Sequence, residues 1–232
     1  MRKHIPNAIT CLNLFSGCIG ITYAFNNNLI YAGYAVVIAA LFDFADGLIA
    51  RVIKIHSPLG KELDSLADVI SFGFLPSAIV YQLFLNAPQL GTVSNYLNYS
   101  AYFITIFSAL RLAKFNIDMR QSDHFIGLPV PANALVVASL PEIVSRGNNF
   151  WSNYILNPYF LFIFSLGMGF LLVMEVPLLS LKFKNLDLKE NLFRYILLFV
   201  AALLILFFNF AAVPIVIFIY IVLSIIQFTF IR

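Results

Sequence analysis

Charge is the scarcest feature of this sequence. Asp, Glu, Lys and Arg make up 11% of the 232 residues, whereas 61% of the residues are hydrophobic. A soluble domain has about 25% charged and 45–50% apolar residues, so the composition excludes an ordinary soluble protein. The net charge of +3 is too small to indicate a nucleic-acid partner.

Cysteine is also nearly absent. The two cysteines, Cys11 and Cys18, both lie in one apolar segment near the start of the chain. A disulfide framework or a cysteine-based metal site is therefore not expected. We expect two small side chains that are buried on one face of a helix.

Long apolar runs are abundant instead. Each is about 17–25 residues long, enough for a helix to cross a hydrocarbon core of roughly 30 Å. We predict an all-α, polytopic membrane bundle of about eight transmembrane helices, in a single domain over residues 1–232. Residues 1–180 would form a six-helix core, and residues 181–232 would add a tight hairpin or, alternatively, one long element. The predicted helices span residues 7–25, 29–51, 62–86, 96–115, 128–145, 155–180, 193–209 and 211–230.

The basic residues predict the orientation of these helices. If the eight helices alternate, all but one of the fourteen Lys and Arg residues fall on one side, and Arg146 falls on the other. Lys and Arg accumulate in cytoplasmic loops, so both termini are predicted to face the cytoplasm. The same basic rim should favour anionic lipid headgroups.

Four aspartates interrupt the apolar pattern between residues 43 and 68. An acid at the centre of a membrane helix costs about 2.5–3.5 kcal/mol, so we expect these acids to form a functional site. Asp43 and Asp46 are three residues apart, and Asp64 and Asp68 are four apart. Each pair therefore projects from one face of its helix.

The residues around the aspartates indicate what they bind. A break at Ser57 to Gly60 would let two helices bring their carboxylates into an oxygen cage of the kind that Mg²⁺ prefers. Gly47 and Ala50 leave the helix bare beside the acids, and Arg51 supplies a planar cation suited to phosphate. The sequence thus predicts a diphosphate site held by metal ions.

This stretch resembles the signature of the CDP-alcohol phosphotransferase family. The pattern D-x2-D-G-x2-A-R-x8-G-x3-D-x3-D is matched at Asp43, Asp46, Gly47, Ala50, Arg51, Gly60, Asp64 and Asp68. Two other segments, IPNAITCLNLFSG and RLAKFN followed by FIGLPVPANA, are similar to the serine-using branch of that family, the bacterial integral-membrane phosphatidylserine synthases. The resemblance covers about residues 5–135, and the last hundred residues resemble the family only in hydropathy.

The resemblance implies an activity and its partners. Members of this branch transfer a phosphatidyl group from CDP-diacylglycerol to the hydroxyl of L-serine and release CMP. It further implies two divalent cations, Mg²⁺ or Mn²⁺, held by Asp43, Asp46, Asp64 and Asp68. A homodimer in membrane lipid is implied as well, in the plasma membrane of a prokaryote and with its active site facing the cytoplasm.

The resemblance also implies roles for single residues. Asp68 would act as general base on the serine hydroxyl in addition to binding metal. Arg111 and Asn116 would bind serine, a zwitterion that needs a cation for its carboxylate and an acceptor for its ammonium group. The CDP-diacylglycerol site would include Asn7, Thr10, Gly47, Ala50, Arg51 and Gly60.

Two other functions fit parts of the pattern. The same chemistry could use glycerol 3-phosphate or inositol phosphate, but an anionic acceptor asks for more cations than Arg111, Lys114 and Arg120 provide. A divalent-cation transporter would also place acids in a membrane. It would not explain the spacing of Gly47 to Gly60, and the chain shows no convincing internal repeat.

Two further acids, Glu142 and Glu175, lie outside this stretch. Glu142 and Arg146 are four apart and are predicted to pair. Glu175 lies in a long apolar segment, which makes it a functional candidate unless its side chain reaches water.

Overall fold

The computed structural model describes residues 4–53, 57–88, 94–118, 125–146, 149–180, 187 and 191–230. Many of the basic residues behind the predicted orientation lie outside the described residues. They are Arg2, Lys3, Lys54, Arg120, Lys182, Lys184, Lys189 and Arg232.

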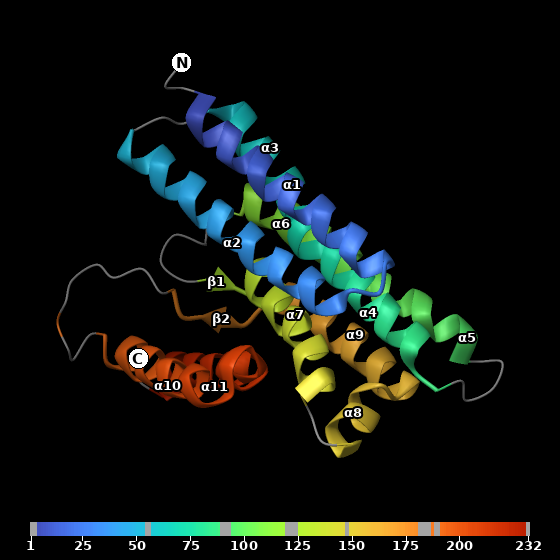
Figure 1. Ribbon diagram of the computed structural model, residues 1–232. Helices are drawn as coiled ribbons and strands as arrows, with labels where there is room; N and C mark the ends of the chain where they lie inside the picture. The colour runs from blue at the N-terminus through green and yellow to red at the C-terminus, as the bar shows by residue number, and fades with distance from the viewer. Residues whose placement is uncertain are drawn as a thin grey trace.

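Eight long helices in the described part of the chain correspond to the eight predicted segments (Figure 1). One of them, residues 58–86, joins α3, a π-helical turn and α4. The long helices are α1 (Ile5–Phe25), α2 (Leu29–Val52), α3 (Pro58–Asp68) with the π turn (Val69–Phe74) and α4 (Leu75–Asn86), α6 (Tyr102–Ile117), α7 (Val130–Arg146), α9 (Pro158–Val173), α10 (Leu192–Phe208) and α11 (Val213–Phe230). The short elements are α5 (Ser94–Leu97), α8 (Asn149–Ile155), 3₁₀ turns at Asn98–Ala101 and Asn209–Ala212, and the strands β1 (Phe125–Ile126) and β2 (Pro177–Leu178).

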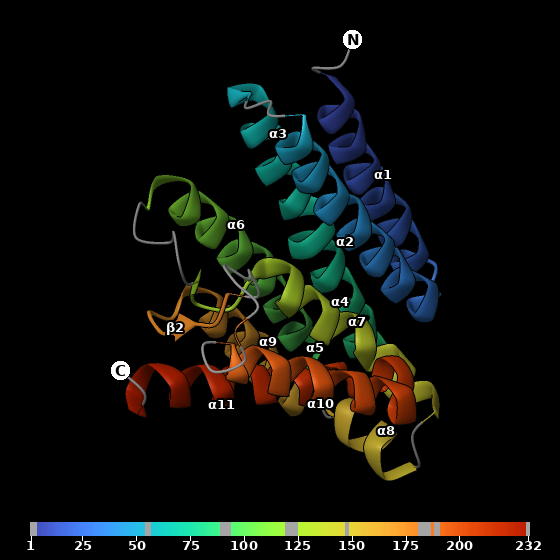
Figure 2. The ribbon, with the colours of Figure 1, turned by 90° about the vertical axis from the view of Figure 1, so that its left-hand side faces the viewer.

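Helix α1 packs closely against α2 and the 58–86 helix (Figures 1 and 2). A Cβ atom at Gly17 would collide with Ser71, and one at Gly20 would collide with Leu75. Small residues allow such close approach of helix backbones in membranes, where helices are held by packing rather than by the hydrophobic effect. The polar side chains of α1 are thereby brought within reach of the helices that carry the aspartates.

The 58–86 helix widens into a π-helical turn just after its aspartates. Pro76 has no backbone N–H and cannot continue the regular ladder, and the Ser77 hydroxyl donates a 3.1 Å hydrogen bond to the carbonyl oxygen of Gly73. Thr105 of α6 donates a 2.7 Å bond to the Ser77 oxygen. Hydroxyls from two helices thus hydrogen-bond the Gly73 carbonyl oxygen within the wide turn.

Three sequence predictions about these elements are wrong in detail. The helix predicted to start at residue 62 starts at Pro58, because Ser57 caps it by accepting a 3.3 Å bond from the Gly60 N–H. Gly60 therefore lies in the first helical turn and not in a break. Cys11 and Cys18 are free but exposed on α1, and not buried.

The helix predicted over residues 155–180 is also too long. Helix α9 ends at Val173, and β2 pairs antiparallel with β1, placing Phe125 opposite Leu178. Pro177 lacks an N–H and biases the residue before it towards an extended backbone. The end of the predicted helix is therefore a short strand.

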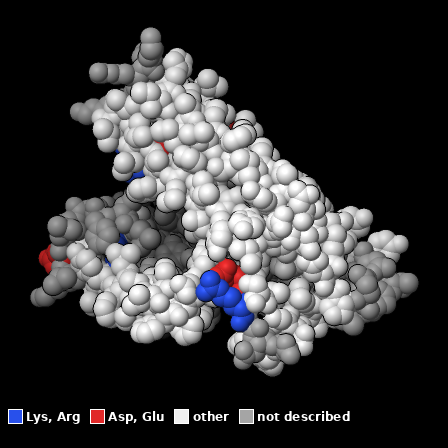
Figure 3. Space-filling view, in the orientation of Figure 1, with Lys and Arg blue, Asp and Glu red and all other residues white. Residues whose placement is uncertain are grey.

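The exposed surface of the described residues is largely apolar, as in a membrane protein. The helices at residues 5–25 and 58–86 and the helical run at residues 192–229 are long and apolar enough to cross a membrane, and α9 is a shorter apolar helix. Large apolar side chains such as Phe15, Phe44 and Phe199 are exposed, and charged atoms are few among the described atoms in Figure 3. The chain is a helical membrane protein.

The run from residue 192 to 229 is a hairpin. Asn209 has a positive φ of 53°, and after it the chain turns back so that α11 lies beside α10 (Figures 1 and 2). Of the two predicted alternatives, the tight hairpin is therefore confirmed. The hairpin contacts α7 and β2 and runs across the direction of α1 and α2 in both views.

Candidate functional site

Three of the four aspartates converge on one point. Asp43 of α2 and Asp64 and Asp68 of α3 each have a carboxylate oxygen within 4.8 Å of the others. Like charges at such distances repel strongly where water is scarce, so the cluster favours a bound cation. The Asp64 Oδ1 atom is buried and lacks a hydrogen-bond partner among the described residues. An oxygen-only donor set with an orphaned carboxylate oxygen fits a hard divalent cation.

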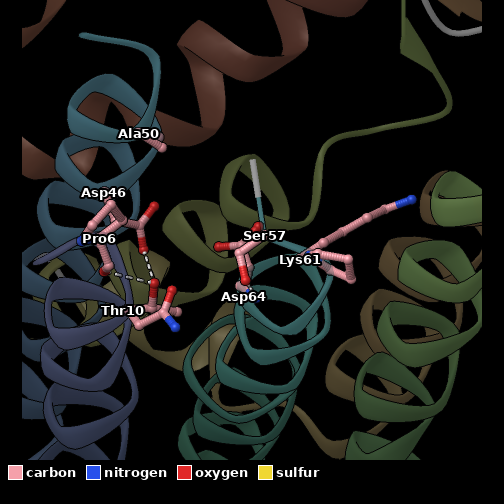
Figure 4. Close-up of a pocket in the computed structure, with 11 residues that line it drawn as sticks. Pro6, Thr10, Asp46, Ala50, Ser57, Lys61 and Asp64 are labelled. Atoms are coloured by element: carbon pink, nitrogen blue, oxygen red, sulfur yellow. Dashed lines mark hydrogen bonds between the residues drawn. The ribbon is translucent and has the colours of Figure 1, made fainter. Parts of the chain in front are cut away.

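Asp46 lies nearby and has a partner of its own. Its Oδ2 accepts a 2.6 Å hydrogen bond from the Thr10 hydroxyl of α1. Figure 4 shows this bond on one wall of a cavity, with Asp64 on the facing wall. Thr10 thus fixes the direction of one carboxylate beside the three that converge.

Asn13 is a site residue that the sequence prediction did not assign. It is fully buried in α1, and its Nδ2 donates a 3.2 Å hydrogen bond to Asp68 Oδ1. Ser71 anchors the same residue by donating a 3.0 Å bond to the Asn13 backbone oxygen. A polar residue three positions after Thr10, on the same helix face, was the available signal.

A cavity of about 530 Å³ opens beside these acids. Its walls are the first turns of α1 and α3 and the last turns of α2 (Figure 4). Five of the six residues predicted to bind CDP-diacylglycerol line it, and Arg51 is not among the residues of the described wall. The lining residues are Pro6, Asn7, Thr10, Asp46, Gly47, Ala50, Ser57, Pro58, Gly60, Lys61 and Asp64.

Small residues keep the cavity open. A Cβ atom at Gly60 would lie 3.0 Å from Asn7 Oδ1, so a larger residue there would press on α1. At Gly47 the nearest atom would be a terminal nitrogen of Arg51, 3.6 Å away. Arg51 itself is exposed, and its Nε donates a 2.9 Å hydrogen bond to the Gly47 carbonyl oxygen.

Arg111 and Asn116 project from different faces of α6. Asn116 Nδ2 donates a 2.8 Å hydrogen bond to the Ser65 hydroxyl on α3. Arg111 is buried, and its Nη2 donates a 3.3 Å bond to the Gly127 carbonyl oxygen. The structure thus brings Asn116 to the aspartate-bearing helix and Arg111 to the segment between β1 and α7, and it does not bring the two into one contact.

Glu142 and Glu175, the two acids singled out in the sequence beyond the aspartates, form ion pairs. Glu142 and Arg146 pair at 2.7 Å, as predicted. Glu175 pairs with Lys114 at 2.7 Å, with both side chains largely exposed. Exposed pairs contribute little to stability, and Glu175 reaches the surface because α9 ends before it.

Comparison with known proteins agrees with the sequence resemblance. A family model described as CDP-alcohol phosphatidyltransferase matches residues 3–177. The chain is 42% identical over 134 residues to a CDP-diacylglycerol–serine O-phosphatidyltransferase of Helicobacter pylori, covering 57% of this chain and 54% of that one. It is 32% identical over 175 residues to the Bacillus subtilis protein of the same name, covering 75% and 89%.

An archaeal protein is similar as well. The archaetidylserine synthase of Methanothermobacter thermautotrophicus is 33% identical over 138 residues, covering 58% of this chain and 56% of that one. The chain spans about half the length of the Helicobacter pylori relative that it matches. The family match extends past the motif region, through α9 to the first residue of β2.

Proposed function

Because the chain belongs to the CDP-alcohol phosphatidyltransferase family, we propose that it transfers a phosphatidyl group from CDP-diacylglycerol to the hydroxyl of L-serine and releases CMP. The observation that carries this proposal is the convergence of Asp43, Asp64 and Asp68 beside a cavity of about 530 Å³. The choice of serine is supported by relatives that are named for that reaction.

The four aspartates would hold two divalent cations, Mg²⁺ or Mn²⁺. Oxygens would come from the converged cluster of Asp43, Asp64 and Asp68. A further oxygen would come from Asp46, whose carboxylate is oriented by its hydrogen bond from Thr10. When bound, such ions neutralise the diphosphate and stabilise the leaving CMP.

Asp68 is the proposed general base. Its carboxylate would accept the serine hydroxyl proton while the serine oxygen attacks the lipid-bearing phosphorus. The bond from that phosphorus to the CMP oxygen breaks, and CMP leaves with the electron pair. The hydrogen bond from Asn13 orients the Asp68 carboxylate for this role.

The cavity is the proposed site of the CDP end of the donor. Asn7, Thr10 and Gly60 would face it from α1 and α3, and Gly47 and Ala50 from α2. Arg51, one turn after Gly47, would contact phosphate at the rim. The acyl chains would extend into membrane lipid. The exposed apolar side chains of α1 and α2 would contact the same lipid.

A panel of acceptors tests the function. Purified protein in detergent, given CDP-diacylglycerol and Mg²⁺ or Mn²⁺, should release CMP with L-serine. Glycerol 3-phosphate and inositol phosphate should give little release. CMP release with one of those acceptors but not with serine would show that serine is not the acceptor. No release with any alcohol would overturn the proposed transferase activity.

Arg111 is proposed to bind the serine carboxylate, with Asn116 nearby on α6. Arg111→Ala removes a charge-assisted contact, so the KM for serine should rise roughly tenfold to a hundredfold while the KM for CDP-diacylglycerol changes little. Steady-state kinetics with each substrate varied in turn measures this. Lys114→Ala, which removes a surface ion pair from the same helix, is the control and should leave both constants unchanged. An unchanged serine KM in Arg111→Ala would remove the assignment.

We also propose that both termini and the aspartates face the cytoplasm, in the plasma membrane of a prokaryote, and that the chain forms a homodimer. After Cys11 and Cys18 are replaced, a cysteine at Asn28 should react with an impermeant thiol reagent from outside the cell. A cysteine at Ser57 should react only in inverted vesicles. Asn28 lies just before the start of α2 at Leu29, and Ser57 lies beyond the other end of α2 at Val52, so labelling of both positions from one side would contradict the orientation.

A further inference from the structure

Side chains of α11, in the α10–α11 hairpin, hydrogen-bond both the N–H and the carbonyl group of Leu179. The Tyr220 hydroxyl donates a 2.8 Å hydrogen bond to the carbonyl oxygen of Leu179, and the Leu179 N–H donates a 3.1 Å bond to the Ser224 oxygen. All three residues are buried. The hairpin lies beyond residue 177, where the family match ends, and the proposed chemistry assigns it no role.

Helix α10 holds the next residue of the same segment. Arg194 Nε donates a 2.8 Å hydrogen bond to the Ser180 carbonyl oxygen, and its Nη1 donates a 2.8 Å bond to Asn191 Oδ1. Ser180 and Asn191 are both buried. Two consecutive residues after β2 are therefore fixed by side chains from the two helices of the hairpin.

The fixed segment is continuous with the strand pair that ends beside Arg111. Strand β2 pairs with β1, and the Gly127 N–H donates a 3.0 Å bond to the Val176 carbonyl oxygen. Gly127 has a φ of +75°, and a Cβ atom there would lie 2.6 Å from the Leu172 carbonyl oxygen. Only glycine fits this close crossing. The carbonyl oxygen of Gly127 is the one that accepts the hydrogen bond from Arg111.

The position of the Arg111 side chain depends on Gly127, next to the β1–β2 strand pair. Arg111 is 7% exposed, and its Nε lacks a hydrogen-bond partner among the described residues. A buried guanidinium with an unused donor is suited to an anionic ligand such as a carboxylate, and the direction of that donor depends on where Gly127, the hydrogen-bond partner of Nη2, lies.

We propose that the α10–α11 hairpin is a positioning element for the acceptor side of the site, and that Tyr220 and Ser224 are positioning residues. Tyr220 and Ser224 fix the position of the Leu179 backbone, and the β1–β2 strand pair carries this constraint to Gly127. The Gly127 carbonyl oxygen in turn orients the Arg111 guanidinium. The inference rests on the proposed function in taking Arg111 to bind the acceptor carboxylate. It adds that this contact is controlled by a part of the chain that the family match does not include.

Kinetics of two variants in the full-length protein test the inference. Tyr220→Phe and Ser224→Ala should each raise the serine KM by roughly threefold to tenfold, the effect of one lost buried hydrogen bond, and leave kcat and the CDP-diacylglycerol KM unchanged. Ser165→Ala is the matched control, because that buried hydroxyl bonds within its own helix, to Leu161. In an Arg111→Ala background, Tyr220→Phe should have no further effect on the serine KM.

Hydrogen exchange supplies a readout that is independent of activity. Amides of Gly127, Leu128 and Leu179 should exchange faster in Tyr220→Phe than in the Ser165→Ala control. If Arg111→Ala raises the serine KM but Tyr220→Phe changes neither constant nor exchange, the inference is overturned and the proposed function stands. If Arg111→Ala itself leaves the serine KM unchanged, the acceptor assignment fails, and faster exchange still shows that the hairpin holds the strand pair.

Discussion

Replacing Asp64 by Asn should lower the rate of CMP release by roughly a thousandfold while leaving the protein folded. Asp64 contributes to both parts of the site, since its carboxylate belongs to the converged cluster and also lines the cavity. Its buried Oδ1 lacks a partner among the described residues, so the carboxylate is not needed for an internal hydrogen bond. Removing one of three repelling charges should leave the stability without metal unchanged or higher.

Two measurements check this expectation. CMP release gives the loss of rate, and thermal unfolding in detergent with and without Mn²⁺ gives the loss of metal binding. Mn²⁺ should raise the Tm of the original protein, because it binds the folded state, and should raise that of Asp64→Asn much less. Glu62→Gln is the control, since Glu62 is exposed two residues earlier on the same helix. Full activity in EDTA would contradict the metal-assisted reaction.

Replacing Ala50 by Leu should abolish productive binding of CDP-diacylglycerol. Ala50 lines the cavity near the end of α2, and three additional carbon atoms there would occupy the space assigned to the donor. We expect the donor KM to rise by roughly a hundredfold, because the leucine side chain and the nucleotide would compete for the same space. The expected serine KM, measured at the highest usable donor concentration, stays close to that of the original protein.

Ala8→Leu is the matched control for this substitution. Ala8 is exposed on α1 and adjoins Asn7, but it is not among the lining residues of the cavity. The same increase in side-chain size should therefore have little effect on either KM. Normal donor kinetics in Ala50→Leu would show that the nucleotide binds elsewhere, while the assignment of the aspartates as metal ligands would be unaffected.

Local patterns in the sequence were sufficient for the helices and the acids. The long apolar runs predicted eight helices because a hydrocarbon core sets their length. The spacing of Asp43 with Asp46, and of Asp64 with Asp68, gave the helix faces. The pairing of β1 with β2 was missed, since strands of two residues leave no periodic signal and their partners are fifty residues apart. The contact of Asn13 with Asp68 was missed because the spacing of residues in the sequence predicts which helix face a side chain lies on, but not which residue of another helix it meets.

Other assignments depend on more than local pattern. The exposure of Cys11 and Cys18 depends on which face of α1 is buried, and that face carries polar and small residues, among them Thr10, Asn13 and Gly17, rather than the apolar ones. Arg111 and Asn116 were grouped by the family resemblance, although residues five apart point in different directions on a helix. Their joint role in binding serine stays a prediction, as does the cytoplasmic orientation.

The π-helical turn at Val69–Phe74 makes the number of residues in that stretch important. Asp64 and Asp68 lie before it, and the buried Leu75 and Ile79 lie after it. In an α-helix each residue advances the side chains by about 100°. A π turn takes up about one residue more than an α turn, so closing Val69–Phe74 into a regular α-helix at unchanged length would rotate the acids by roughly that angle relative to the core side chains. A single-residue deletion within Val69–Phe74 that lets the turn close should therefore disturb the acids less than a single-residue insertion, which the already widened turn would also have to take up.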